Sequence, residues 1–206
     1  MRTRVKICGI TRVEDVQAAV RAGVDAIGLV FDPKSPRYVT TERAATIAQA
    51  VGPFVSVVGL FVDAAPETIR GTLSRVPVTL LQFHGSETPG QCSLYDLPYM
   101  KAVRMRDGVD LHAEAAAHAD AVALLLDTYV PEVAGGSGRA FDWKRIPADL
   151  NKPIVVAGGL SAANVGTAIK SARPYAVDVS SGVEMTKGIK DPEKIEAFMR
   201  AVREAV

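Results

Sequence analysis

The chain has 206 residues, and 24 Lys and Arg stand against 23 Asp and Glu, which leaves a formal net charge of +1. That balance gives no electrostatic reason to expect a nucleic acid or a membrane as a partner. Apolar residues make up 48% of the chain and charged residues 23%, so a disordered or low-complexity protein is excluded. The length is enough to bury a substantial core.

Cysteine and histidine usage excludes several kinds of site. Cys8 and Cys92 are too few for a disulfide framework, and they form no CxxC pair. The 3 histidines and the 2 cysteines show no zinc-ligand pattern, so we expect no metal site. The first ten residues lack the apolar stretch of a signal peptide, and no apolar run approaches the ~18–20 residues of a membrane span. We therefore expect a cytoplasmic protein.

Short apolar or β-branched segments alternate along the chain with Ala-rich segments of helical period. The strand-like segments are 5–10, 26–31, 54–62, 78–83, 99–104, 121–127, 153–159 and 175–182. The helix-like segments are 12–23, 40–52, 65–76, 110–119, 161–172 and 191–205, and the connections after the fourth and sixth strands are poor or short helices. We expect Thr11 and Thr40 as helix N-caps and Ser161 at the start of the helix over 161–172. We expect Gly23 and Gly52 to end the first two helices.

This alternation of strands and helices is typical of parallel βαβ units. We predict that residues 1–206 form a single (β/α)₈ TIM-barrel domain, with about 26 residues in each unit. A doubly wound open sheet is the alternative. It would use only about five or six strands and would leave the remaining strand-like segments unexplained.

Polar residues occupy one face of several predicted strands near their carboxyl ends. Because side chains alternate with a period of two, the apolar residues of these strands should face the helices and the polar residues the barrel interior. Active sites of such barrels lie at the carboxyl ends of the strands. An interior layer that merely tolerates hydrogen-bonded polar groups is the alternative. The candidates are Cys8, His84, Asp127, Asp178 and Ser180, and Lys6 and Gln82 share the faces of the first two.

Two glycine-containing loops follow the last two predicted strands. Glycine lets the backbone approach an anion closely, and the N-terminus of the helix after the first loop adds positive potential. In barrels of this type these loops are the usual phosphate site. The segment 128–142, which is also rich in glycine, is either a lid or a flexible connector. The predicted phosphate-binding residues are Gly158, Gly159, Ser180, Ser181 and Gly182.

Seven segments form a specific pattern that runs from residue 5 to about residue 203. They are KICGIT (6–11), GLVFDPKSPRYV (28–39), LLQFHGSE (80–87), LLLDT (124–128), GGSGRAFDW (135–143), VVAGGLSAANV (155–165) and VDVSSGVE (177–184). Together they resemble the phosphoribosylanthranilate isomerase family of tryptophan biosynthesis. The resemblance implies a (β/α)₈ barrel that rearranges N-(5-phosphoribosyl)anthranilate to 1-(2-carboxyphenylamino)-1-deoxyribulose 5-phosphate. It implies a small phosphosugar as ligand and no cofactor or metal.

The resemblance also implies roles for individual residues. The cysteine of KICG matches the general base of the family, and it is Cys8 here. The aspartate that ends the sixth strand matches the general acid, and it is Asp127 here. Arg37 in KSPRYV matches the arginine near the anthranilate carboxylate, and the glycine loops match the phosphate site. We expect His84 to be an auxiliary substrate-binding residue and assign Asp178 to substrate binding as well.

The chemistry of the reaction suits these residue types. An acid must protonate the furanose ring oxygen and open the ring to a Schiff base, and a base must then remove the proton at C2′. The resulting enolamine tautomerises to the ketone. A lowered pKa would help Cys8 to act as a thiolate base. Lys6 on the same face is either its cationic neighbour or a member of a structural ion pair.

Two other functions stay open on the residues alone. A related phosphosugar isomerase of histidine biosynthesis performs the same chemistry, but it would be expected to use two aspartates, and Cys8 speaks against it. A non-catalytic phosphosugar-binding barrel could keep the glycine loops but would have no need for Cys8 and Asp127 together. The sequence is compatible with a monomer or a homodimer.

Overall fold

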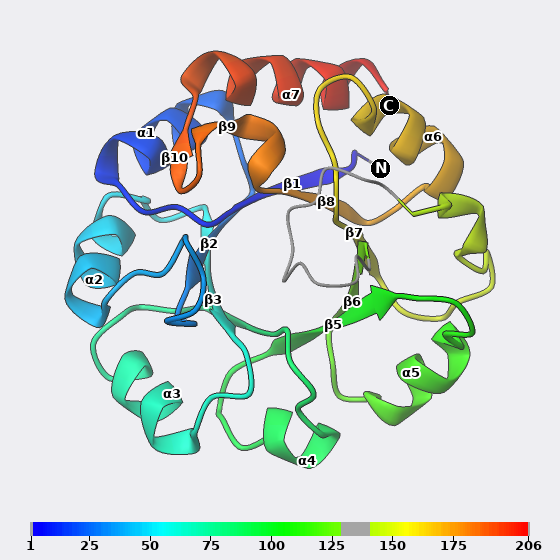
Figure 1. The fold of residues 1–206 in the computed structure, drawn as a ribbon, viewed down its shortest axis with the longest axis horizontal. Coiled ribbons are helices and arrows are strands. Elements are labelled where there is room, and N and C mark those ends of the chain that lie inside the picture. Colours follow the sequence, from blue (N-terminus) through cyan, green and yellow to red (C-terminus); the bar gives the residue numbers. More distant parts are fainter. Residues whose placement is uncertain (1, 129–140, 206) are drawn as a thin grey trace.

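Eight parallel strands close into a barrel, and helices surround it as a ring (Figure 1). The computed structural model describes residues 2–128 and 141–205. Each strand pairs with the next, and β8 pairs with β1 to close the barrel, so the (β/α)₈ prediction is confirmed and the open-sheet alternative is wrong. The strands are β1 (Arg4–Cys8), β2 (Ala26–Val30), β3 (Ser56–Phe61), β4 (Leu80–Phe83), β5 (Tyr99–Met105), β6 (Ala123–Thr128), β7 (Ile154–Val156) and β8 (Ala176–Val179).

The helices follow the predicted segments. Within the described residues, no helix is long and apolar enough to cross a membrane. Residues 129–140 make up most of the segment for which a lid was one alternative, and they lie outside the described residues. The helices are α1 (Val13–Ala22), α2 (Thr41–Gln49), α3 (Pro66–Leu73), the short α4 (Pro89–Cys92), α5 (Leu111–Ala117), α6 (Val165–Ala172), α7 (Pro192–Glu204) and a three-residue 3₁₀ helix, η1 (Trp143–Arg145).

Two of the five predicted helix signals are confirmed. The side chain of Thr40 accepts a hydrogen bond from the amide of Arg43, and Gly23 ends α1 with a φ of 88°. Asn164, and not Ser161, is the N-cap of α6, and Ala50 is the C-cap of α2, so Gly52 lies beyond the position predicted for it.

The prediction that Thr11 caps α1 is wrong, because Arg12 occupies the N-cap position without a side-chain bond. The Thr11 hydroxyl instead donates to the carbonyl of Gly188, 2.5 Å away. The Thr11 hydroxyl, which the local pattern predicted as the cap of α1, is therefore bonded to a residue near the end of the chain.

A small antiparallel hairpin follows β8 and was not predicted. It consists of a 3₁₀ turn, η2 (Ser181–Val183), and the strands β9 (Glu184–Thr186) and β10 (Ile189–Lys190). The hairpin lies beside β1 and α1 at one end of the barrel (Figure 1). It thereby brings residues from the end of the chain next to the first strand.

The two faces of the strands form separate apolar layers. Val5 and Ile7 belong to the large layer between strands and helices, and both are buried. A smaller layer fills the barrel interior, with Val58 and Leu125 among its buried members. Burying such a side chain stabilises the fold by about 1.5–3 kcal/mol relative to an exposed one. The interior polar residues discussed below lie on this second face, as the alternation predicted.

Candidate active site

Lys6 and Asp178 form a buried ion pair inside the barrel. They face each other across β1 and β8, and the Lys6 Nζ lies 2.8 Å from Oδ2 of Asp178. Burial lowers the pKa of Lys6, but Asp178 and Cys8 outweigh that effect and raise it above its usual value, so the ammonium is charged. Lys6 is therefore both a member of an ion pair and a cationic neighbour of the Cys8 thiol. Substrate binding by Asp178 stays a prediction.

Cys8 ends β1 with its side chain on the interior face. It lies opposite Gly28 of β2, and a Cβ at that position would come within 2.8 Å of the Cys8 Sγ. Burial raises the pKa of the thiol, although Lys6 and Lys190 act in the opposite direction. The pKa of Cys8 is therefore not lowered, because the desolvation of a thiolate at this depth exceeds the help from both lysines.

Asp127 belongs to a hydrogen-bonded chain of three side chains. Nε2 of His84 lies 3.1 Å from Oδ2 of Asp127, and Nδ1 of His84 lies 2.9 Å from Nε2 of Gln82. The His84 and Asp127 side chains are 18% and 13% exposed, so both can be reached from outside, whereas Gln82 is fully buried. The polar faces of β4 and β6 therefore meet, as their alternation predicted.

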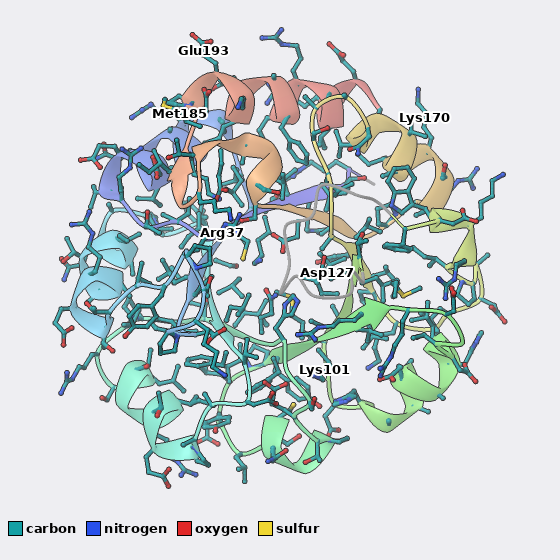
Figure 2. All side chains as sticks on the ribbon, in the orientation of Figure 1. Arg37, Lys101, Asp127, Lys170, Met185 and Glu193 are labelled. Carbon is teal, nitrogen blue, oxygen red and sulfur yellow. The ribbon has the colours of Figure 1, made fainter. Side chains whose placement is uncertain are left out.

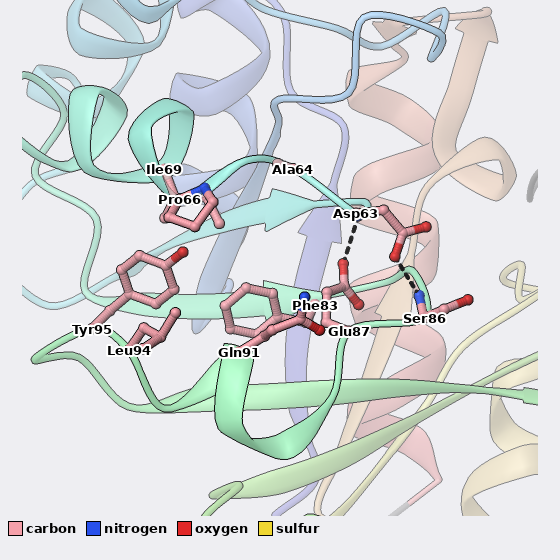
Figure 3. Close-up of a pocket in the computed structure, with 10 residues that line it drawn as sticks. All are labelled: Asp63, Ala64, Pro66, Ile69, Phe83, Ser86, Glu87, Gln91, Leu94 and Tyr95. Carbon is pink, nitrogen blue, oxygen red and sulfur yellow. Dashed lines mark hydrogen bonds between the residues drawn. The ribbon is translucent and has the colours of Figure 1, made fainter.

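A second buried ion pair braces the loop that carries His84. Nζ of Lys101 lies 2.9 Å from Oε2 of Glu87 and also donates to the carbonyl of Gly85. Glu87 in turn accepts hydrogen bonds from the amides of Gly85 and Asp63, and Figure 3 shows the contact with Asp63. Because Glu87 bonds to the loop after β3 at Asp63 and to the loop after β4 at Gly85, it holds the two loops together beside His84.

The cavity drawn in Figure 3 lies on the other face of β4. It has a volume of about 160 Å³, and Phe83, Ile69 and Tyr95 are among its lining residues. Phe83 belongs to the apolar layer between strands and helices, whereas His84 next to it points to the interior. The cavity is therefore separated from Cys8 and Asp127 by the sheet itself.

Arg37 is held by a carboxylate that the sequence analysis missed. Its Nε and Nη2 lie 2.7 and 2.8 Å from the two carboxylate oxygens of Glu184. The fully buried Lys190 contacts the same carboxylate at 2.9 Å and donates to the carbonyl of Ser180. Burial raises the pKa of Glu184, but Arg37 and Lys190 outweigh it and lower the pKa below its usual value. One carboxylate thus serves two cations, which leaves local positive charge for an anionic ligand.

Arg37 and Asp127 lie inside the ring of helices, on opposite sides of the barrel (Figure 2). By contrast, Lys170 and Glu193 lie on the outer helices in the same view. Glu184 belongs to the SSGVE segment, which was predicted as a glycine-containing loop. Nothing in the sequence indicated that its carboxylate binds Arg37. Lys190 had no signal at all, because its two-residue strand is too short to form a pattern.

The two predicted phosphate loops lie against each other. A Cβ on Gly182 would come within 1.9 Å of the carbonyl oxygen of Leu160, so only glycine allows this approach. Gly158 has a φ of +80°, and a Cβ there would lie 2.7 Å from Oδ1 of Asp127. The loop after β7 therefore adjoins the carboxyl group of Asp127. The residues Gly158, Gly159, Ser180, Ser181 and Gly182 are all half-buried.

No group of three or more His, Cys, Asp and Glu side chains in the described ranges could hold a metal ion. The side chains at this end of the barrel provide groups that can react with a ligand. They supply a thiol at Cys8, a carboxyl group at Asp127, and positive charge near Arg37. That set can exchange protons with a ligand and bind its anionic groups.

Comparison with known proteins gives consistent matches. The model of the family described as N-(5′-phosphoribosyl)anthranilate (PRA) isomerase matches residues 5–201. The N-(5′-phosphoribosyl)anthranilate isomerase of Pseudomonas fluorescens (strain SBW25) is 58% identical over 200 residues, which cover 97% of this chain and 95% of the relative. The structure of phosphoribosyl anthranilate isomerase from Thermotoga maritima matches with a TM-score of 0.90 and 40% identity, over 98% of this chain and 99% of that one.

A further solved structure includes a ligand. It is a phosphoribosyl anthranilate isomerase in complex with reduced 1-(o-carboxyphenylamino)-1-deoxyribulose 5-phosphate. It matches with a TM-score of 0.87 and 38% identity, over 98% of this chain and 99% of that one. These matches favour neither of the two alternative functions considered above.

Removing one partner of the buried Lys6–Asp178 pair should destabilise the barrel. We expect Lys6→Met to lower the free energy of unfolding by about 3–5 kcal/mol, because it leaves the Asp178 carboxylate buried without its cation. The double variant Lys6→Met/Asp178→Asn should recover much of that loss. Urea unfolding at neutral pH measures both. If the single and double variants lose the same free energy of unfolding, the unpaired Asp178 carboxylate is not the cause of the destabilisation.

Proposed function

We propose a division of catalytic roles on the premise that the chain belongs to the N-(5′-phosphoribosyl)anthranilate isomerase family. The protein is an isomerase of tryptophan biosynthesis that converts N-(5′-phosphoribosyl)anthranilate to 1-(2-carboxyphenylamino)-1-deoxyribulose 5-phosphate. The observation that supports the roles best is that Cys8 and Asp127 lie at the carboxyl ends of β1 and β6, at the same end of the barrel. Both side chains lie on the interior face, where one ligand can meet an acid and a base.

Asp127 is the general acid in this proposal. It donates a proton to the furanose ring oxygen of the substrate, the C1′–O bond breaks, and its electron pair stays on that oxygen. The lone pair of the anthranilate nitrogen forms the C1′=N bond of the Schiff base. The half-buried position of Asp127 supports this role, because a partly dry site strengthens the interaction of an acid with the charge that develops.

Cys8 is the general base. Its thiolate removes the proton at C2′, the electrons of that bond form C1′=C2′, and the Schiff-base nitrogen becomes the amine of an enolamine. A proton then adds at C1′ while the C2′ hydroxyl loses its proton, which gives the ketone. The ammonium of Lys6 supports this role, because a neighbouring cation stabilises the thiolate against its burial.

The ends of the substrate are bound by the remaining candidates. The backbone of the glycine loops at Gly158, Gly159 and Gly182 binds the phosphate, helped by Ser180 and Ser181. Arg37 binds the anthranilate carboxylate with the guanidinium edge that Glu184 leaves free. His84 and Asp178 complete the site as substrate-binding residues. We propose a cytoplasmic monomer or homodimer, and light scattering distinguishes one 21.8 kDa chain from two.

Removing either proton-transfer group should lower kcat strongly. We expect Cys8→Ala and Asp127→Asn each to reduce kcat by ~10²–10⁴, the range for a positioned acid or base. The loss of substrate fluorescence with freshly generated phosphoribosylanthranilate measures the rate. Cys92→Ala is the matched control, since this second buried cysteine lies on α4 outside the barrel, and it should keep wild-type kcat. If Cys8→Ala or Asp127→Asn keeps wild-type kcat, the role assigned to it is wrong.

The raised pKa of Cys8 predicts the direction of the pH dependence. Because the base acts when deprotonated and burial raises the pKa of this thiol, kcat/KM should keep rising from about pH 7 to beyond about pH 9 as the thiolate forms. In Cys8→Asp a carboxylate takes the place of the thiolate, so the rise should move to lower pH. The measurement is kcat/KM across that range for both proteins. A wild-type profile that is flat from neutral to alkaline pH would exclude Cys8 as the base.

The loss of the Arg37 guanidinium should act mainly on binding. We expect Arg37→Met to raise KM by more than ~10-fold, because a hydrogen bond to a charged group contributes about 1.5–3 kcal/mol. Its effect on kcat should be smaller than that of Cys8→Ala, since the carboxylate is remote from C1′ and C2′. The control is a substrate analogue without the carboxylate, which both proteins should bind almost equally. A comparable loss on the analogue would assign Arg37 to another part of the ligand.

A further inference from the structure

Gln82 is a buried polar side chain that the mechanism above does not use. None of its surface is exposed, and its register neighbours are Leu60 on β3 and Met100 on β5, which are both buried and apolar. An amide in such surroundings costs free energy unless its groups are hydrogen-bonded. Among the described residues, Oε1 of Gln82 has no hydrogen-bond partner, so the bond that its Nε2 makes is the one that holds the side chain.

This bond sets the proton position on His84. Nε2 of Gln82 lies 2.9 Å from Nδ1 of His84, and an amide nitrogen can only donate. Nδ1 therefore accepts, and the proton of the neutral imidazole is on Nε2. Nε2 lies 3.1 Å from Oδ2 of Asp127, so it donates to that oxygen. The hydrogen bonds run in one direction, from Gln82 through His84 to Asp127.

Turning the amide of Gln82 over would reverse the direction. Its oxygen would then accept from Nδ1–H of His84, and Nε2 would become an acceptor that faces the Asp127 carboxyl group. Two acceptors repel each other unless Oδ2 carries the proton of Asp127. In that arrangement the proton of Asp127 would be donated from Oδ2 to Nε2 of His84 and would not face the substrate. The orientation of Gln82 thus decides which oxygen of Asp127 carries its proton.

Within the described residues, Oδ1 of Asp127 accepts no hydrogen bond, and it adjoins the loop after β7. A Cβ on Gly158 would lie 2.7 Å from Oδ1, so this oxygen is next to the proposed phosphate loop. Because Oδ2 already receives the hydrogen bond from His84, the proton of a neutral Asp127 belongs on Oδ1. We propose that Gln82 is a positioning residue that fixes the Nε2–H tautomer of His84 and so keeps the acidic proton of Asp127 on Oδ1, toward the substrate.

The inference rests on the proposed role of Asp127 and adds to it. When the Oδ1 proton moves to the furanose oxygen and the C1′–O bond breaks, a carboxylate remains on Asp127. The bond from Nε2 of His84 then becomes charge-assisted and stabilises that carboxylate. A fixed tautomer makes this stabilisation available without any rearrangement during the step.

Nitrogen NMR of the whole protein tests the tautomer directly. We use ¹⁵N-histidine protein and assign the His84 signals by their absence in His84→Ala. The wild type should show a protonated Nε2 and an unprotonated Nδ1, and Gln82→Met should show both tautomers. Met100→Leu changes the packing beside Gln82 without changing its hydrogen bond, and it should keep the wild-type pattern. A wild type with the proton on Nδ1 overturns the proposal even if no Gln82 variant folds.

Kinetics then tests whether the tautomer matters for the reaction. Gln82→Met should lower kcat about 10-fold and change KM by less than about 3-fold. In the His84→Ala background the same substitution should have no further effect, because Gln82 acts through His84. A wild-type kcat in Gln82→Met, or an equal loss in the His84→Ala background, overturns the proposal.

The two proposals fail in different ways. If Asp127→Asn keeps wild-type kcat, the acid role of Asp127 is wrong, and the kinetic part of this inference falls with it. If Asp127→Asn loses activity while Gln82→Met keeps both the wild-type tautomer and kcat, only the role of Gln82 is wrong.

Discussion

A closed parallel barrel leaves each strand with one face that no helix covers, and polar side chains on that face must bond to one another. This constraint explains the pairs in the interior of the barrel. Lys6 reaches Asp178 across two neighbouring strands, and Gln82 reaches Asp127 through His84. Because these bonds exist in the folded chain, the reactive groups are held in place before a ligand arrives, which reduces the reorganisation that catalysis needs.

The charged side chains at the carboxyl end of the barrel also bond to one another. The carboxylate of Glu184 binds both Arg37 and Lys190, and the hairpin after β8 brings it there. Two cations on one carboxylate leave an excess of positive charge beside the glycine loops. The substrate of the family carries a phosphate and a carboxylate, so its two anionic ends suit this end of the barrel.

The barrel and its interior polar face could be predicted because both depend on short-range patterns. The period of two places Cys8, His84 and Asp127 on one face without any knowledge of their partners. Glu184 could not be assigned, because its role depends on a contact with Arg37, 147 positions away in the chain. Lys190 could not be assigned, because its role depends on that same carboxylate. The raised pKa of Cys8 could not be predicted either, because the burial of the thiol cannot be read from the presence of Lys6 two positions earlier. Tertiary contact also overrode the local cap signal of Thr11.

The central claim is that one ligand occupies this end of the barrel and meets Cys8 and Asp127 together. A crystal structure of the protein with reduced 1-(o-carboxyphenylamino)-1-deoxyribulose 5-phosphate tests it most directly. The account predicts the phosphate on the loops at Gly159 and Gly182, the sugar carbons between Cys8 and Asp127, and the carboxyphenyl group at Arg37. A ligand bound in the cavity beside Tyr95, or a phosphate away from the two glycine loops, would contradict it.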